Sequence, residues 1–161
     1  MGAVTIRPAA PADAPAIMGL IRDLAVYEHL AHEVVGSEAL LHEHLFGAHP
    51  VANVLMGLLN DEVAGFALYF TSYSTFLTRP GLYLEDLFVR PECRGAGLGK
   101  ALLVGLAGLC VERGYGRLEW SVLDWNEPAI KFYEAMGARP MDGWTITRVT
   151  GDALAALAGR Q

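Results

Sequence analysis

The feature that most constrains the fold is a glycine-rich turn between an apolar strand and a long helix. Residues 82–89 are typical of a strand, which Pro91 ends. Three alternate glycines at 95–99 then lead into a helix expected over Gly97–Arg113, with Gly114 as its C-terminal stop. Glycine lets the backbone adopt a positive φ and lets an anion approach the amides. A helix N-terminus adds unpaired N–H groups and partial positive charge, so the stretch predicts a diphosphate cradle.

Glycine spacing distinguishes among the known phosphate cradles. The dinucleotide fingerprint Gly-x-Gly-x-x-Gly fails, because Lys100 or Leu102 stands where its last glycine belongs. The phosphate loop of nucleotide hydrolases fails at its first and last positions, which are Arg94 and Ala101. An ordinary glycine turn before a core helix is the alternative for this stretch taken alone. The pattern that the sequence meets is Arg-x-x-Gly-x-Gly, at Arg94, Gly97 and Gly99.

This pattern resembles the acetyl-CoA diphosphate signature of the GNAT N-acetyltransferase superfamily, and a second segment strengthens the resemblance. In residues 124–138, Asn126 can cap a helix over 127–136, Tyr133 follows seven residues later, and Gly137 ends the helix. In that family the Asn side chain contacts the pantetheine arm and the Tyr hydroxyl lies beside the CoA sulfur. The resemblance implies an acetyl-CoA site at Leu87, Phe88, Val89, Arg94, Gly95, Ala96, Gly97, Leu98, Gly99, Lys100, Asn126, Pro128 and Ala129.

The order of the remaining elements predicts an α/β fold. Hairpin strands come first and strand–helix–strand units follow, which predicts a mixed sheet with helices on both faces. The GNAT fold implied by the resemblance has a mostly antiparallel central sheet. The length of 161 residues predicts one domain, residues 1–161. The further strands are expected at 4–7, 51–59, 63–71, 117–123 and 144–150, and the further helices at 13–27, 38–46 and 151–158.

Charge narrows the class of partner. The chain has 12 basic and 18 acidic residues, a net charge of −6, and its only lysines are Lys100 and Lys131. Phosphate binding by a nucleic-acid surface needs clustered positive charge, so the composition argues against such a surface. An acidic chain suits a small cationic ligand better, although solubility alone also explains the balance.

Cysteine and hydropathy predict a cytoplasmic protein that is neither disulfide-linked nor membrane-bound. Cys93 and Cys110 are the only cysteines, and no Cys/His spacing typical of a metal site occurs, so no metal is expected. The longest apolar run, residues 101–111, is shorter than the ~20 residues that a bilayer requires. The five histidines fall within residues 29–49 without metal-ligand spacing, and their role stays open.

Further segments resemble the diamine acetyltransferase branch of the superfamily, which includes the spermidine/spermine and thialysine enzymes. These segments lie at 4–8, 24–28, 83–89 and 143–144. A polyamine site needs acidic groups spaced along an aromatic groove. The loop at 73–76 differs from the polyamine enzymes and is closer to the thialysine type, which leaves small aminoalkyl amines open as acceptors. The branch implies an acceptor site at Tyr27, Glu28, Glu85, Asp86, Asp142 and Trp144.

Acetyl transfer to an amine assigns a role to each candidate. A backbone N–H near Leu87, where the family's strand separates from its neighbour, would stabilise the oxyanion. The amine must lose a proton before it attacks, since its pKa is near ~10. Glu85 is the expected base, acting through water, and Tyr133 is the expected acid for the thiolate. Direct attack in a ternary complex needs no acyl-enzyme, so neither cysteine has an expected role.

Two other classes of function stay open at this stage. The acceptor of such an enzyme can instead be an amino acid, an antibiotic or a protein N-terminus. A GNAT-shaped module can also bind acyl-CoA as a sensor without turnover. The resemblance further implies a homodimer, often with an exchanged C-terminal strand. Charge and hydropathy predict no partner that is a nucleic acid or a membrane.

Overall fold

The computed structural model describes residues 2–159, which form two compact units. The first unit ends at Leu123 and the second begins at Asp124. Within residues 2–159, no helix combines the length and the apolar character needed to cross a membrane.

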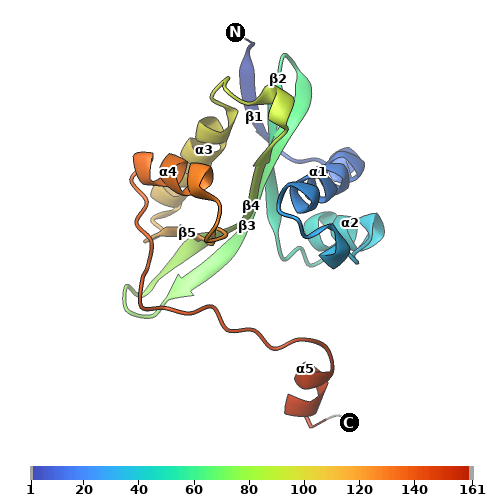
Figure 1. Ribbon diagram of the computed structural model, residues 1–161, viewed down its shortest axis with the longest axis vertical. Coiled ribbons are helices and arrows are strands. Elements are labelled where there is room, and N and C mark those ends of the chain that lie inside the picture. The colour runs from blue at the N-terminus through green and yellow to red at the C-terminus, as the bar shows by residue number, and fades with distance from the viewer. Residues whose placement is uncertain (1, 160–161) are drawn as a thin grey trace. The chain divides into compact units, whose positions relative to one another are not determined.

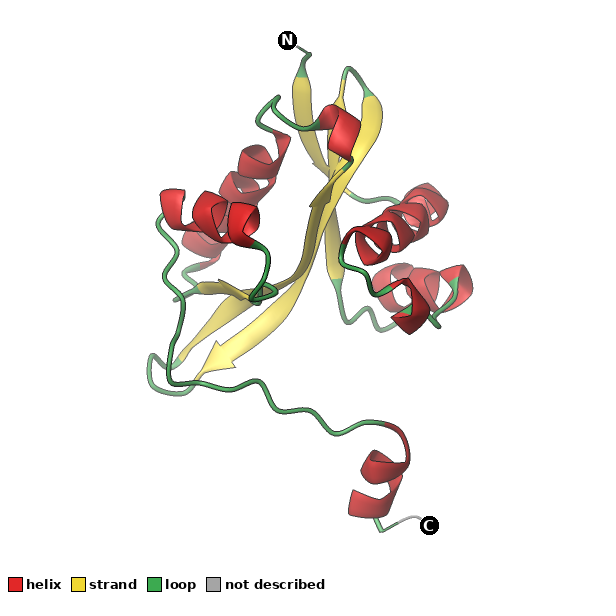
Figure 2. Ribbon diagram, in the orientation of Figure 1, coloured by secondary structure: helices red, strands yellow, loops and turns green. Residues whose placement is uncertain are grey.

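A five-stranded sheet forms the centre of the first unit (Figures 1 and 2). The strands lie in chain order, and every neighbouring pair is antiparallel except the last, which is parallel. The expected mixed, mostly antiparallel sheet is therefore confirmed. The strands are β1 (Val4–Pro8), β2 (Asn53–Leu59), β3 (Glu62–Ser74), β4 (Arg79–Val89) and β5 (Leu118–Trp120).

Helices cover both faces of this sheet, as the sequence predicts. Figure 1 shows α1 (Ala14–Tyr27) and α2 (Glu38–Phe46) on one face and α3 (Leu98–Arg113) on the other. The core under α1 and α2 is one buried apolar cluster that includes Ile17, Leu20, Phe66 and Phe88. Three short 3₁₀ turns, η1 (Pro11–Asp13), η2 (Ala31–Glu33) and η3 (Pro91–Cys93), connect these elements.

Strand β4 contains a bulge at Glu85. Asp86 pairs with Leu68 of β3, whereas the next β3 residue, Tyr69, pairs with Leu84, so Glu85 is the extra residue of β4. The parallel pairing of β4 with β5 covers only residues 82–84 of β4. The strand therefore separates from β5 just before Leu87. The family resemblance implies a separation at this point.

The first turn of α3 lies close against the sheet. A Cβ atom added at Gly57 of β2 would lie 2.9 Å from Cδ1 of Leu98, the first residue of α3. Leu98 is almost fully buried, so it has little room to retreat. Glycine at position 57 thus fixes how closely the turn before α3 approaches the strands.

The second unit contains α4 (Glu127–Ala135) and α5 (Gly151–Leu157). The strand expected at 144–150 is not formed, because a strand needs a hydrogen-bonded neighbour and these residues pair with none in the described chain. The expected strand at 117–123 shortens to β5. The loop between β3 and β4 is limited to residues 75–78, because the two strands continue their pairing to Ser74 and Arg79.

Gly57→Ala should lower the free energy of unfolding by about 1–3 kcal/mol, because the added methyl overpacks the contact with Leu98. Urea unfolding measures this change. The matched control is Gly108→Ala, at an exposed α3 position with nothing within 4 Å of the new methyl, where alanine should stabilise by up to about 1 kcal/mol. Equal stability of Gly57→Ala and the wild type would contradict the close-packing argument.

Candidate active site

The turn before α3 has the geometry of an anion cradle. Gly95 and Gly97 have φ values of +91° and +87°, a region that favours glycine, and Gly97 is the N-cap of α3. Both glycines are exposed, and nothing lies within 4 Å of a Cβ built at either one. The first intrahelical bond runs from the Ala101 N–H to the Gly97 carbonyl, so the three preceding amides lie in the turn that lacks helical acceptors. These amides and the open space beside the glycines fit a diphosphate group.

Arg94 enters this turn with its guanidinium against two aromatic rings. Its Nε donates a 3.0 Å hydrogen bond to the Val89 carbonyl, which ties the turn to the end of β4. The guanidinium carbon lies 4.8 Å from the centre of the Tyr27 ring and 5.6 Å from that of Phe88. The two rings meet edge to face at 6.4 Å.

Three carboxylates gather where β4 meets the end of α1. Glu28 is the C-terminal cap residue of α1, and Glu85 and Asp86 occupy the bulge of β4. Burial raises the pKa of Asp86 to about 7, and the negative charges of Glu85 and Glu28 contribute to the rise. Burial also raises the pKa of Glu28 above its usual range. The cluster therefore concentrates negative charge at this point, and one of its carboxyls exchanges a proton near neutral pH.

The bulge determines which face of the sheet carries Asp86. Asp86 lies opposite Leu68, which in turn lies opposite Val54, a member of the core under α1. Residues directly opposite one another in an antiparallel pair share a face. Asp86 is thus on the α1 face together with Phe88, while Glu85 is exposed.

The other residues of the first unit that the sequence predicts to bind acetyl-CoA lie at the end of β4 and around the start of α3. Leu87 and Val89 continue β4 beyond its pairing with β5, and the Phe88 side chain is committed to the apolar core. The Leu98 side chain is almost fully buried and anchors the start of α3 in the core. Ala96 lies in the glycine turn, whereas Gly99 and Lys100 lie in the first turn of α3, where Lys100 is exposed.

The second unit contains the other expected residues. The Asn126 side chain accepts a 3.4 Å hydrogen bond from the Ala129 N–H and so caps α4, with Pro128 in the first turn, as the sequence predicts. Tyr133 is in the last part of α4, with its ring 5.5 Å from that of Phe132. Asp142 and Trp144 lie in the irregular segment after α4, and both are exposed.

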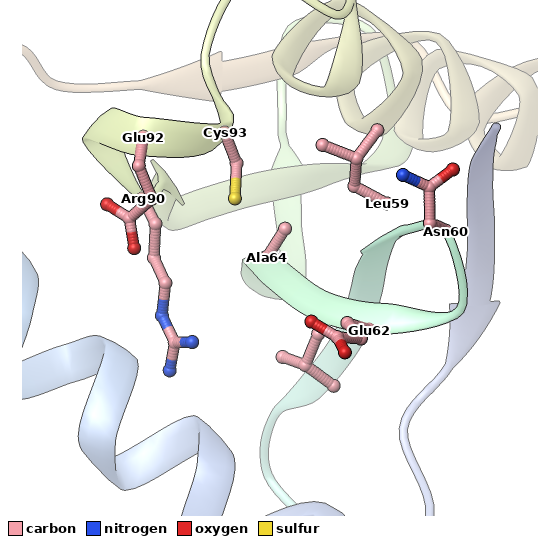
Figure 3. Close-up of a pocket in the computed structure, with 8 residues that line it drawn as sticks. Leu59, Asn60, Glu62, Ala64, Arg90, Glu92 and Cys93 are labelled. Carbon is pink, nitrogen blue, oxygen red and sulfur yellow. The ribbon is translucent and has the colours of Figure 1, made fainter. Parts of the chain in front are cut away.

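A hollow of about 370 Å³ lies beside the β2–β3 turn and η3 (Figure 3). Its lining contains Cys93 together with charges of both signs, on Arg90, Glu62 and Glu92. No histidine, the usual partner of a reactive thiol, is among the lining residues. Among residues 2–159, no group of three or more histidine, cysteine or acidic side chains can hold a metal ion.

Sequence reasoning missed two features of this site. It assigned Asp86 only to acceptor binding, whereas the structure raises the pKa of Asp86 to about 7. The signal was present in the adjacent acids Glu85 and Asp86, but a bulge is needed to direct Asp86 toward the apolar face. The stacking of Arg94 on Tyr27, 67 positions earlier, has no local sequence signal.

Comparison with known proteins identifies a family and several relatives. Residues 19–138 match the model of the acetyltransferase (GNAT) family. A thialysine N-epsilon-acetyltransferase from Bos taurus is 39% identical, over 99% of this chain and 100% of the relative. An L-ornithine N5-acetyltransferase from Arabidopsis thaliana is 37% identical, over 94% of this chain and 86% of the relative.

A solved structure shares the fold over nearly the whole chain. An integron cassette protein from the mobile metagenome of V. cholerae superposes with a TM-score of 0.80 at 28% identity, covering 96% of this chain and 97% of the other. A ribosomal-protein-alanine N-acetyltransferase from Brucella melitensis has a TM-score of 0.72 at 22% identity, covering 91% of this chain and all of the other, which extends the likeness of fold.

Asp86→Asn should raise the free energy of unfolding at pH 8 by about 1–3 kcal/mol, a range that allows for solvent screening of a half-buried group. Asp86 has a pKa of about 7 when folded, against about 3.9 for an unperturbed aspartate. The unfolded wild type therefore releases its proton first as pH rises from about 4 to about 7, and wild-type stability falls over that window.

Urea unfolding at pH 4, 6 and 8 tests this expectation, and the advantage of the variant should vanish at pH 4. Glu62→Gln, which neutralises an exposed carboxylate on β3, is the control and should show no such trend. A pH-independent difference for Asp86→Asn would disprove the raised pKa.

Proposed function

Because the chain belongs to the acetyltransferase (GNAT) family and is an amine N-acetyltransferase, we propose that it transfers acetyl from acetyl-CoA to the side-chain amine of a small cationic acceptor. The observation that carries this proposal is the anion cradle at residues 94–100, which follows the strand that bears Glu85 and Asp86 of the carboxylate cluster. The family match spans residues 19–138 and so includes parts of both units, which supports one GNAT domain over the chain.

We assign the diphosphate of acetyl-CoA to the amides of residues 95–100 and to Arg94. The positive φ of Gly95 and Gly97 and the open space beside them support this assignment. The β4 backbone at residues 87–89 is assigned to the acetyl and pantetheine end, because β5 no longer pairs with it there. Asn126, Pro128 and Ala129 at the start of α4 are assigned to the pantetheine arm.

The acceptor is proposed to be an amino acid or diamine with a terminal primary amine. One relative is named for N5 of ornithine and another for N-epsilon of thialysine, both amines on an aminoalkyl side chain. A third, 29% identical, is named as spermidine/spermine N(1)-acetyltransferase-like, which keeps polyamines in the tested class. The cation is assigned to Glu28, Glu85 and Asp86, with Tyr27, Asp142 and Trp144 as further contacts.

The proposed chemistry is direct transfer in a ternary complex. The neutral amine nitrogen attacks the thioester carbonyl carbon, so that a C–N bond forms and the C–S bond breaks. Glu85 and Asp86 form the proton acceptor of the amine, with Glu85 reached through water. The Leu87 N–H donates to the developing oxyanion, and Tyr133 gives its proton to the departing thiolate. Solvent then restores the Tyr133 proton.

We also propose that the protein is a homodimer in which residues 144–150 complete the sheet of a second copy. This segment pairs with no strand of the described chain, yet its side chains at Trp144 and Ile146 are apolar and 81% and 72% exposed. Light scattering after gel filtration should give twice the monomer mass for the wild type. Ile146→Asp should shift the mass to that of the monomer, and a monomeric wild type would overturn the proposal.

An amine panel with acetyl-CoA, followed by release of free thiol, tests the proposed function. Thialysine, ornithine, lysine, 1,3-diaminopropane and spermidine form the panel, with an aminoglycoside and a peptide N-terminus as competing acceptors. Turnover with the first group supports the proposal. Turnover with the competing acceptors alone reassigns the acceptor class. CoA binding without any turnover indicates a sensor, and calorimetry that detects no CoA binding refutes the assigned cradle.

Tyr133→Phe should lower kcat by ~10²–10⁴-fold, the scale of a lost general acid, while the affinity for acetyl-CoA changes little. Steady-state kinetics and calorimetry on the same preparation separate the two effects. Tyr115→Phe removes one hydroxyl elsewhere in the chain and should leave kcat unchanged. An unchanged rate in Tyr133→Phe would remove this residue from the mechanism.

A further inference from the structure

We propose that Tyr27 is a positioning residue for Arg94, so that the aromatic ring at the end of α1 holds the diphosphate-binding arginine and couples acetyl-CoA binding to acceptor binding. This inference rests on the proposed function and assigns Tyr27 a role beyond acceptor contact. Its basis is the stack of Arg94, in the turn before α3, on Tyr27 of α1 and Phe88 of β4.

The hydrogen bond and the ring contacts of Arg94 use different parts of its guanidinium. Nε is bonded to the Val89 carbonyl, and the flat face lies against the two rings. Neither interaction occupies the outer edge, which carries the two terminal nitrogens. A guanidinium presents its donors in the plane of the group, so that edge can bind phosphate oxygens while the face stays stacked. The stack is therefore compatible with diphosphate binding, and it restricts the orientation of Arg94 before the diphosphate binds.

Of the two rings that hold Arg94, the Phe88 ring is itself fixed. Phe88 is 4% exposed within the core under α1, and it supports the Tyr27 ring edge to face at 6.4 Å. Arg94, by contrast, is an exposed side chain at a glycine turn, where a long side chain has many rotamers. Holding Arg94 in one orientation reduces the conformational entropy lost when the diphosphate binds, so the ring should increase acetyl-CoA affinity.

The same ring is one residue from the acceptor cluster. Glu28 follows Tyr27 directly, and its N–H is bonded to the Leu24 carbonyl, which keeps it in register with α1. The Glu28 charge acts on Asp86 of β4. A cation bound between Glu28 and Asp86 fixes the end of α1, and this also fixes the ring under Arg94. Acetyl-CoA and the amine should therefore bind with positive coupling through Tyr27.

The test is calorimetry of CoA with single and paired variants. Tyr27→Met keeps an apolar side chain without a ring and should weaken CoA binding by about 3–10-fold, the scale of a cation–π contact. Tyr27→Phe keeps the ring and should retain wild-type CoA affinity. Val26→Ala is the control at the exposed neighbouring position and should also bind CoA like the wild type.

A double-mutant cycle separates positioning from a general loss of structure. In an Arg94→Lys background, which keeps the charge but not the flat stacking group, Tyr27→Met should weaken CoA binding by less than about 2-fold. In kinetics, Tyr27→Met should raise the KM for acetyl-CoA and abolish the increase in CoA affinity that a saturating amine produces in the wild type.

Equal CoA affinity of Tyr27→Met and the wild type would overturn the inference, as would additive effects of the two substitutions. A Tyr27→Met variant that raises only the amine KM would return Tyr27 to acceptor contact alone. If Tyr27→Met does not fold, the other two variants test the inference. Tyr27→Phe should bind CoA like the wild type, and the inference fails if Arg94→Lys also binds CoA as tightly as the wild type. A wild type without CoA affinity would refute the proposed function itself.

Discussion

The bulge of β4 is the constraint on which the carboxylate site depends. With strict alternation, Leu82, Leu84, Asp86 and Phe88 would all point to one face of the sheet. The extra residue at Glu85 reverses the alternation, so that Leu84 and Leu87 share one face while Asp86 and Phe88 share the other. The bulge thereby directs Asp86, an acid in a largely apolar strand, to the end of α1 beside Glu28.

The pairing of β4 explains how one strand can carry both halves of a site. Strand β3 pairs with β4 from Arg79 to Val89, which keeps β4 rigid, whereas β5 leaves β4 after Leu84. The backbone beyond that point is therefore supported on one side and open on the other. The glycine turn continues from this open end, and the Nε bond of Arg94 to the Val89 carbonyl joins the turn to the strand. Carboxylates and cradle are thus positioned by the same ladder of hydrogen bonds.

Features with local physical causes could be predicted from the sequence. The residues Asn60 and Asp61 favour positive φ and form the turn between β2 and β3, and Ser37 caps α2 through a hydrogen bond from the Leu40 N–H. Gly97 and Gly114 bound α3 with positive φ, as expected for glycine at helix ends. The order of α3, β5 and α4 after the glycine turn also agrees with the prediction, because caps and stop signals act within a few residues.

Features that depend on distant partners could not be predicted in this way. The segment at 144–150 has the composition of a strand, but pairing decides whether a strand forms, and no residue pattern within it names a partner. The bulge at Glu85 depends on how β3 and β4 align their apolar faces. The contact between Arg94 and Tyr27 depends on where the end of α1 lies against β4.

The raised pKa of Asp86 bears directly on the difficulty of the proposed reaction. An alkylamine has a pKa near ~10, and an ordinary aspartate lies about 6 units lower, so proton transfer between them is strongly unfavourable. At about 7, Asp86 reduces that gap to roughly 3 units. The same negative neighbours that raise this pKa also attract the cationic acceptor. In the proposed reaction, attraction of the substrate and acceptance of its proton thus depend on the same carboxylate cluster, and the β4 bulge contributes to both because it directs Asp86 to the buried face.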